Sequence, residues 1–223
     1  MMSDAQKQLA PRFSMKDVTV HERSRLFKKH FALDEYIVSY KKFDGSETPK
    51  LVREIFERDQ DAVAILPYDA KTDEVVLIEQ FRPGAMKDPI SPWLIEIVAG
   101  LIDFGEHEID AAMRELNEEA HFKVTPDELK YITAVYPSPG GISERVSVYF
   151  ANVDATHIDN HGGLEKENED IRIFKVPAEA AFEACKSGRI CNCAALVGLL
   201  NLQLAHQEIR QEFLNKRLTK EQH

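Results

Sequence analysis

The stretch that decides the fold is Gly100-Leu-Ile-Asp-Phe-Gly-Glu106, followed by Arg114-Glu115-Leu116-Asn117-Glu118-Glu119. It combines a glycine, a glutamate six residues later and, after a fixed gap, an arginine–glutamate pair with two more glutamates. Residues three and four apart lie on one side of a helix, so a helix here gathers the carboxylates of Glu115, Glu118 and Glu119 on one face. The stretch therefore predicts a helix over residues 108–120 that presents a cluster of acidic side chains.

The same predicted helix carries an apolar stripe on another side. At roughly 100° per residue, the centre of the stripe lies about 130° from the carboxylates, so the helix buries one side and aims the acidic side into a cleft. Carboxylates at this spacing repel one another, and a hard divalent cation would offset the repulsion. The alternative is a solvated acidic face, but the fixed positions of the glycine, Glu106 and Arg114 favour the metal site. The stripe consists of Ile109, Ala112, Met113, Leu116 and Ala120.

Composition restricts the class of protein. The chain has 223 residues, which suits one medium domain with a smaller appendage. Hydrophobic residues make up 43% and charged residues 30%, as in a globular protein with an ample core. The net charge of −10 argues against nucleic acid or an anionic membrane as a partner. An anionic small substrate remains compatible, because metal ions and local arginines can invert the field within a site.

The N-terminal segment, the apolar runs and the cysteines together indicate the cellular compartment of the protein. The N-terminal segment has no apolar region typical of a signal peptide, and no apolar run reaches membrane-spanning length. The three cysteines, Cys185, Cys191 and Cys193, suit a reducing cytosol. We interpret them as structural thiols, because Cys191 and Cys193 have no second ligand pair at zinc spacing. These features predict a cytoplasmic protein.

Two domains are expected. Residues 1–16 form a polar, frayed start, and strands near 18–21, 36–40 and 51–58 form a small antiparallel sheet. Three strands are too few to stand alone, so we expect residues 1–59 to pack on the main domain or on a second subunit. Residues 60–223 form the main domain.

The main domain mixes strands and helices. Residues 62–67 and 74–81 make a hairpin, and a polar loop over 154–170 is long enough to suggest a function. We predict an α/β (α+β) sandwich with a mixed sheet. The remaining predicted elements are strands at 93–99, 130–136, 145–152 and 171–176, and helices at 108–120, 178–187 and 193–216.

The spacing Gly-x5-Glu-x7-Arg-Glu-Leu-x-Glu-Glu resembles the box of the Nudix family. Five further stretches make the chain similar to the bacterial ADP-ribose pyrophosphatase branch of that family, over roughly residues 18–205. Pro137 or Pro139 supplies the proline that marks this branch downstream of the box. The resemblance implies an α/β/α sandwich, and a homodimer in which exchanged N-terminal sheets help to build each pocket. The five stretches are 53–58, 78–82, 93–100, 138–145 and 167–171.

The resemblance also implies a metal site. It assigns two or three Mg²⁺ ions per site, with Mn²⁺ as an alternative, to Glu115, Glu118, Glu119 and the carbonyl of Ala99. Glu169 matches an additional metal contact. On the long loop, Glu167 matches the general base that deprotonates the attacking water. The alternative interpretation is that Glu167 is only a solvated charge on this loop.

The implied substrate is a nucleoside diphosphate sugar. Arg82 and Glu144 match groups that hold the diphosphate and the terminal ribose, because arginine offers a rigid fork to phosphate. Arg53 and Arg58 have an alternative reading as ordinary surface residues of a strand. The other pocket residues that the resemblance implies are His30, Phe31, Glu54, Leu101, Ser138, Pro139 and Gly140.

Two positions depart from the family pattern. His121 stands where a glycine usually ends the box helix, so histidine must either adopt a positive φ or end the helix differently. His30 stands where relatives often place phenylalanine near the adenine, and the adjacent Phe31 is the alternative stacking partner.

The predicted function is hydrolysis of ADP-ribose to AMP and ribose 5-phosphate. One alternative is another nucleoside diphosphate sugar, such as GDP-mannose, which shares the diphosphate. A second alternative is a sensor that binds ADP-ribose without cleaving it. Because all box carboxylates are present and no basic helix-turn-helix is visible, the sequence favours the enzyme.

Overall fold

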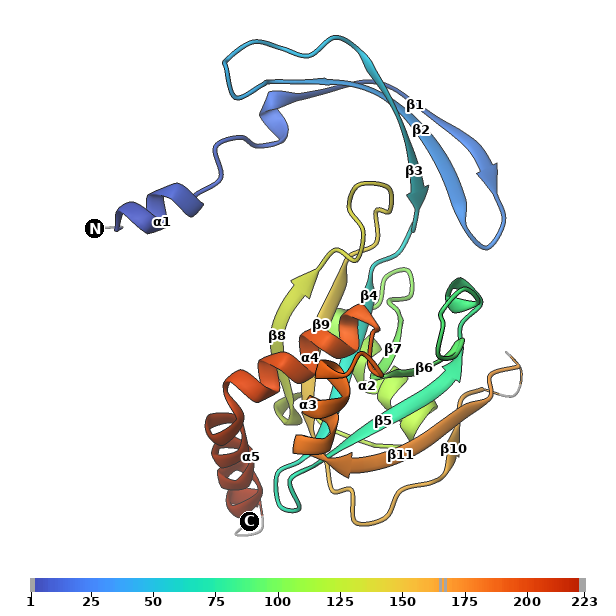
Figure 1. Ribbon diagram of the computed structural model, residues 1–223, viewed down its shortest axis with the longest axis vertical. Coiled ribbons are helices and arrows are strands. Elements are labelled where there is room, and N and C mark those ends of the chain that lie inside the picture. The colour runs from blue at the N-terminus through green and yellow to red at the C-terminus, as the bar shows by residue number, and fades with distance from the viewer. Residues whose placement is uncertain (1–2, 165, 167, 221–223) are drawn as a thin grey trace. The chain divides into compact units, whose positions relative to one another are not determined.

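The computed structural model describes residues 3–164, 166 and 168–220. Helices and strands mix along the chain and fall into two compact units (Figure 1). The first unit contains the chain up to Asp59 together with Ser138–Ser143. The second contains Gln60–Pro137 and the chain from Glu144 onward. A segment distant in sequence therefore joins the N-terminal unit, which the sequence did not indicate.

The first unit is built on three antiparallel strands in the order β1-β2-β3. The predicted frayed start is wrong for Asp4–Leu9, which forms helix α1. Ser3 caps this helix by accepting from the backbone N–H of Gln6, whose side chain accepts from the backbone of Ser3 in return. The other elements of the unit are the 3₁₀ turn η1 (Met15–Asp17), β1 (Val18–Lys28), β2 (Ala32–Tyr40) and β3 (Leu51–Glu57).

A buried charge organises this small sheet. The side chain of Asp34 on β2 is fully buried, and it accepts from Arg23 Nε at 2.8 Å and from Arg25 Nε at 2.8 Å. The hydrogen bonds from Arg25 and then Arg23 outweigh burial and lower the pKa of Asp34. Two cations on β1 thus hold one anion on the neighbouring strand.

The second unit contains an eight-stranded mixed sheet. Its main path is β10-β11-β5-β4-β9-β8, in which β4 and β9 are parallel and the other neighbours antiparallel. Strands β6 and β7 lie off this path. The bounds are β4 (Ala62–Asp69), β5 (Glu74–Phe81), β6 (Trp93–Glu96), β7 (Val98–Leu101), β8 (Leu129–Val135), β9 (Val146–Asn152), β10 (His161–Gly162) and β11 (Ile171–Pro177).

The sheet opens between β4 and β5. These strands pair only where Tyr68 faces Val75 and Asp69 faces Glu74. Beyond that point, β6 pairs with β5 and β7 pairs with β4. The single strand predicted over 93–99 is therefore wrong, because the chain changes partner at Ile97 and delivers β7 to the box.

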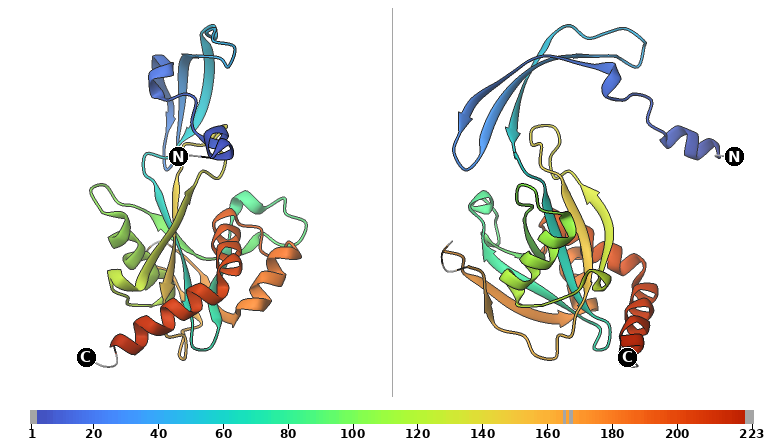
Figure 2. Two further views of the ribbon diagram at one scale, coloured as in Figure 1. Left: turned by 90° about the vertical axis from the view of Figure 1, so that its left-hand side faces the viewer. Right: turned by 180° about the vertical axis from the view of Figure 1, so that it is seen from behind.

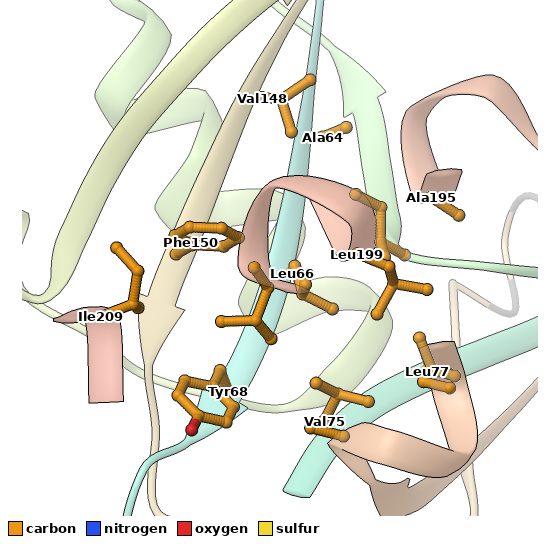
Figure 3. Close-up of a cluster of buried hydrophobic side chains, with 14 of the residues drawn as sticks. Ala64, Leu66, Tyr68, Val75, Leu77, Val148, Phe150, Ala195, Leu199 and Ile209 are labelled. Carbon is orange, nitrogen blue, oxygen red and sulfur yellow. The ribbon is translucent and has the colours of Figure 1, made fainter. Parts of the chain in front are cut away.

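Helices cover both faces of the sheet. Helix α2 (Glu108–Ala120) lies on one side, and α3 (Ala178–Lys186) and α4 (Cys193–Leu204) lie on the other (Figure 2). Successive residues of β4 alternate between these layers: Leu66 packs in one core with Leu199 of α4, whereas Ile65 packs in the other with Leu116 of α2. The first core is drawn in Figure 3. These layers confirm the predicted α/β/α sandwich and its mixed sheet.

The predicted helix over 193–216 is interrupted. Helix α4 ends at Leu204, Ala205 leaves the helical region at φ −120° and ψ 27°, and α5 (His206–Lys220) starts anew. Asp73, in the β4–β5 turn, accepts from Arg210 at 3.2 Å and lies 2.7 Å from His206 Nε2, so α5 is tied to the end of the hairpin. The second unit also contains two short 3₁₀ turns, η2 (Pro83–Ala85) and η3 (Pro126–Glu128). Among the described residues, no helix combines the length and hydropathy needed to cross a bilayer.

Candidate active site

The box helix forms with the predicted bounds. Glu108 and Asp110 place negative charge in the first turn of α2, where the helix dipole favours it. At the C-terminal end, His121 adopts the left-handed conformation at φ 59° and donates its backbone N–H to Asn117 O and Leu116 O. Its ring Nδ1 lies 2.7 Å from Asp159 Oδ2. Histidine thus adopts the positive φ that the sequence allowed, at about 1 kcal/mol.

Arg114 joins the box helix to the loop before it. It donates from Nε and Nη2 to the two oxygens of Glu106, at 2.9 and 2.8 Å, and from Nη2 to the carbonyl of Leu101 at 2.9 Å. Its Nη1 donates to Glu115 at 2.6 Å and to Glu118 at 3.1 Å. The hydrogen bond from Arg114 lowers the pKa of Glu106. One guanidinium therefore holds the loop in place and faces two box carboxylates.

Glu119, near the C-terminal end of α2, is buried against β7. It is only 4% exposed, and its Oε2 accepts the backbone N–H of Ala99 at 2.9 Å. Burial raises the pKa of Glu119 to about 8, and the neighbouring charges of Glu115 and Glu169 add to the rise. Among the charged groups that act on this carboxylate, the anions Glu115 and Glu169 outweigh the cation Arg82.

The position of the Glu115 side chain explains why glycine occupies residue 100. A Cβ added to Gly100 would lie 2.0 Å from Cδ and Oε1 of Glu115, so only glycine leaves room for this carboxylate against β7. Burial raises the pKa of Glu115, and the charges of Glu118 and Glu169 add to the rise, while Arg114 opposes it. Glu115 and Glu119 therefore share a site with an excess of negative charge.

Two further groups face this site. Glu169 accepts the backbone N–H of Leu164 at 3.0 Å, and its charge acts on both Glu115 and Glu119. Arg82 carries the opposite charge: burial lowers its pKa, but the ion pair with Glu96 and the charges of Glu119 and Glu169 reverse the shift. The predicted base, Glu167, lies outside the described residues, as does Glu165.

The box carboxylates do not converge on one point. Among the described residues, no three His, Cys, Asp or Glu side chains are grouped as metal ligands would be. The hydrogen bonds explain the spread, since Arg114 draws Glu115 and Glu118 while Glu119 turns toward the backbone of Ala99. The side chains share a region of the molecule without forming a coordination sphere.

The first unit gathers its own set of predicted residues. The Phe31 ring packs on Phe56 with ring centroids 4.8 Å apart and on His30 at 4.5 Å. The guanidinium of Arg58 lies 4.7 Å from the centroid of the same ring. Phe31 is the centre of this cluster, which offers an aromatic face flanked by a cation.

The 138–143 loop is attached to this cluster through β3. Phe56 donates its N–H to Gly141 O at 2.7 Å, and Ser143 Oγ accepts the N–H of Arg58 at 2.8 Å. The predicted pocket residues of the loop, Ser138, Pro139 and Gly140, are exposed, as are Arg53 and Glu54 on β3. Glu144 and Leu101 are partly buried in the second unit.

Sequence reasoning missed Glu96. This residue is 3% exposed on β6 and accepts from Arg82 Nε at 3.0 Å and from Arg82 Nη2 at 2.7 Å. The available signal was a single carboxylate inside the apolar run Trp93-Leu-Ile-Glu-Ile-Val-Ala, since a buried glutamate has to be paired.

The fold is an α/β/α sandwich with a mixed sheet. Its acidic helix, α2, is joined to the preceding loop by Arg114. The model of the NUDIX domain family matches residues 58–189. The chain belongs to the Nudix family.

Known proteins similar to this chain refine the comparison. It is 42% identical over 201 residues to the ADP-ribose pyrophosphatase of Escherichia coli (strain K12), covering 90% of this chain and 95% of the relative. It is 32% identical over 190 residues to the GDP-mannose pyrophosphatase of Escherichia coli O1:K1 / APEC, covering 85% of this chain and 96% of the relative. A crystal structure described as an ADP compounds hydrolase matches with a TM-score of 0.66 at 20% identity, covering 89% of this chain and 99% of that one. At this level of identity, the similarity to the ADP compounds hydrolase supports the fold alone.

Proposed function

We propose that this protein hydrolyses the diphosphate of ADP-ribose to AMP and ribose 5-phosphate with the help of divalent metal ions. The observation that carries the proposal is that Glu115 and the buried Glu119 lie on one face of α2, where burial and the neighbouring carboxylates raise the pKa of both. The relative from Escherichia coli K12, with its 42% identity, supports the choice of substrate.

The donor set fits a hard divalent cation. Carboxylate oxygens on α2 and the carbonyl of Ala99 are the ligands that Mg²⁺ or Mn²⁺ prefers. Glu115 and Glu118 would exchange their bonds with Arg114 for the cation, while Arg114 remains anchored to Glu106. Glu119 and Glu169 complete the proposed set. When bound, two or three such ions would neutralise charge on the phosphoryl oxygens and lower the pKa of the attacking water.

The chain's own residues supply the rest of the proposed mechanism. Arg82, fixed by Glu96, holds the diphosphate, and Glu144 holds the terminal ribose. Glu167 accepts the proton of the attacking water. The Phe31 and Arg58 cluster stacks on the base, together with His30. The further proposed substrate contacts are Leu101 in the second unit and Arg53, Glu54, Ser138, Pro139 and Gly140 in the first.

We propose that the enzyme acts as a homodimer in the cytoplasm. A three-stranded sheet with several exposed apolar side chains supports dimerisation through residues 17–59. The cysteines Cys185, Cys191 and Cys193 are all free thiols, which suits a reducing compartment. The net charge of −10 supports a small anionic substrate rather than nucleic acid or a membrane.

A direct assay tests the proposal. Purified protein is incubated with ADP-ribose and Mg²⁺ or Mn²⁺, and the products are separated by chromatography. We expect equal amounts of AMP and ribose 5-phosphate, and none in the presence of a chelator. Absence of AMP with either metal, from protein that unfolds cooperatively, would contradict the proposal. GDP-mannose is the second candidate, because a relative named for that substrate is 32% identical, and faster turnover of GDP-mannose would favour it.

A substitution tests the metal cluster. Glu119→Gln keeps the volume and can still accept from Ala99 N–H, but it removes the anionic ligand. We expect at least about a hundredfold loss of turnover, the scale for removing one group that stabilises transition-state charge. Asp110→Asn, on the exposed side of the same helix, is the matched control and should keep wild-type turnover. A near-wild-type rate for Glu119→Gln at saturating Mg²⁺ would show that this cluster is not the metal site.

A further inference from the structure

Glu96 is a buried carboxylate outside the box and outside every predicted site. It lies on β6 opposite Ile78 of β5 and is 3% exposed. Its Oε2 accepts both donors on one edge of Arg82 and, at 3.4 Å, the side-chain amide of Gln80. Its Oε1 accepts Nδ2 of Asn192 at 2.8 Å. Both oxygens are therefore bonded, which fixes the plane of the carboxylate.

Asn192 holds Glu96 from a rigid position. It is the N-cap of α4, where its Oδ1 accepts the backbone N–H of Ala195 at 3.1 Å. Since the amide oxygen faces the helix and the amide nitrogen faces Glu96, neither rotation nor a flip of the amide preserves both bonds. The first turn of α4 thus determines where the Glu96 carboxylate points.

Arg82 is the end of this series of contacts. Its side chain is 42% exposed, so it reaches from the buried Glu96 toward solvent. Glu96 engages Nε and Nη2, and no described residue is bonded to Nη1. The charges of Glu119 and Glu169 contribute to the raised pKa of the Arg82 guanidinium. Glu96 therefore holds one edge of the guanidinium, and the partly exposed opposite edge remains available to a ligand.

We propose that Asn192 and Glu96 are positioning residues that hold the Arg82 guanidinium in the orientation that receives the diphosphate. A free arginine side chain samples many rotamers, and ordering it on binding has an entropic cost. Fixing it in the folded protein removes that ordering cost from substrate binding. The inference rests on the proposed function, in which Arg82 contacts the diphosphate.

A purely structural role makes different predictions. If Asn192 only capped α4 and Glu96 only neutralised Arg82, their loss would lower stability and leave the KM of the folded enzyme unchanged. If they orient Arg82, their loss raises KM and has no further effect once Arg82 is gone. The two roles can therefore be separated by kinetics.

Asn192→Ser is the informative substitution. Serine is as good an N-cap as asparagine, so the bond to Ala195 N–H is kept, whereas the donor to Glu96 is lost. Because the contact acts on bound substrate and transition state alike, we expect KM for ADP-ribose to rise about two- to tenfold with kcat nearly unchanged. Asn201→Ser, at another asparagine of α4 bonded to Val197 O, is the matched control and should leave both constants unchanged.

A double-mutant cycle decides whether the effect passes through Arg82. In the Arg82→Ala background, Asn192→Ser and Glu96→Gln should cause no additional rise in KM. An equal rise in both backgrounds would overturn the inference, as would an unchanged KM for Asn192→Ser in the wild-type background.

A measurement without substrate separates this inference from the proposed function. Solvent exchange of the Arg82 Nε–H, followed by NMR, should be slow in the wild type and faster in Asn192→Ser. Unchanged exchange would overturn the positioning role even if ADP-ribose is cleaved. Faster exchange in a protein that cleaves no ADP-ribose would support the Asn192–Glu96–Arg82 link and refute the proposed function instead.

Discussion

Gly100→Ala should impair activity at the acidic site much more than it lowers the stability of the fold. The added Cβ would lie 2.0 Å from Cδ and Oε1 of Glu115 and 2.3 Å from its Oε2. Ordinary van der Waals contact begins at 3.4 Å, so the carboxylate has to retreat by more than an ångström. The obstacle is the far end of a flexible side chain rather than backbone, and we therefore expect the helix and β7 to stay in place.

The two consequences differ in size. Moving Glu115 breaks its 2.6 Å bond with Arg114, a partly buried charge-assisted hydrogen bond worth about 1–3 kcal/mol of unfolding free energy. Displacing a proposed metal ligand by an ångström costs on the order of a hundredfold in rate. Gly100→Ala should therefore lose most of its activity at a temperature where it remains folded.

The assay combines steady-state hydrolysis of ADP-ribose with thermal unfolding of the same preparation. Gly198→Ala is the matched control: it lies in α4, its added Cβ meets nothing closer than 3.4 Å, and alanine should stabilise the helix by up to about 1 kcal/mol without changing turnover. Wild-type kcat/KM in a folded Gly100→Ala protein would refute the argument, because Glu115 could then be displaced without consequence.

Three further outcomes are expected. Glu167→Gln should lower kcat by about 10²–10⁴-fold with little change in KM, and the deficit should shrink at high pH, where hydroxide replaces the activated water; a larger kcat loss for Glu165→Gln or Glu169→Gln would reassign the base. Light scattering at micromolar concentration should give twice the 25.4 kDa chain mass, and a mass of one chain would refute dimerisation. Asp34→Asn should destabilise the protein by about 1–3 kcal/mol at neutral pH, because two arginines lose their anion. Since the pKa of Asp34 is lowered in the folded state, this difference should be full above pH about 4 and vanish as the pH falls through the lower folded value; a difference that is constant down to acid pH would contradict it.

Local patterns predicted the parts of the fold that depend on local physics. Helix α2 has the predicted bounds, because its acidic first turn and apolar stripe act within a few residues of one another. The box and the extended resemblance identified the family for the same reason, since their signal is spacing along the chain. His121 likewise adopts one of the two conformations that the sequence allowed.

Long-range contacts decided what local patterns could not. Residues 93–99 read as one strand because every residue favours extended structure, yet the gap between β4 and β5 forces a change of partner at Ile97. Residues 193–216 read as one helix because Leu196, Leu199, Leu200 and Leu204 lie on one side and no proline interrupts the stretch. The chain nevertheless turns at Ala205, where Asp73 of the β4–β5 turn is bonded to α5.

The amino-acid sequence by itself determined which residues can bear the chemistry: the carboxylates of the box, the arginine that braces them and the glycine before them. Only the tertiary structure decided how they are held. It placed the carboxylate of Glu115 over Gly100, put 138–143 in the N-terminal unit, and joined Asn192 to Arg82 through Glu96. The reason is physical: residue type and spacing are properties of the chain, whereas burial and hydrogen-bond partners depend on where distant segments meet.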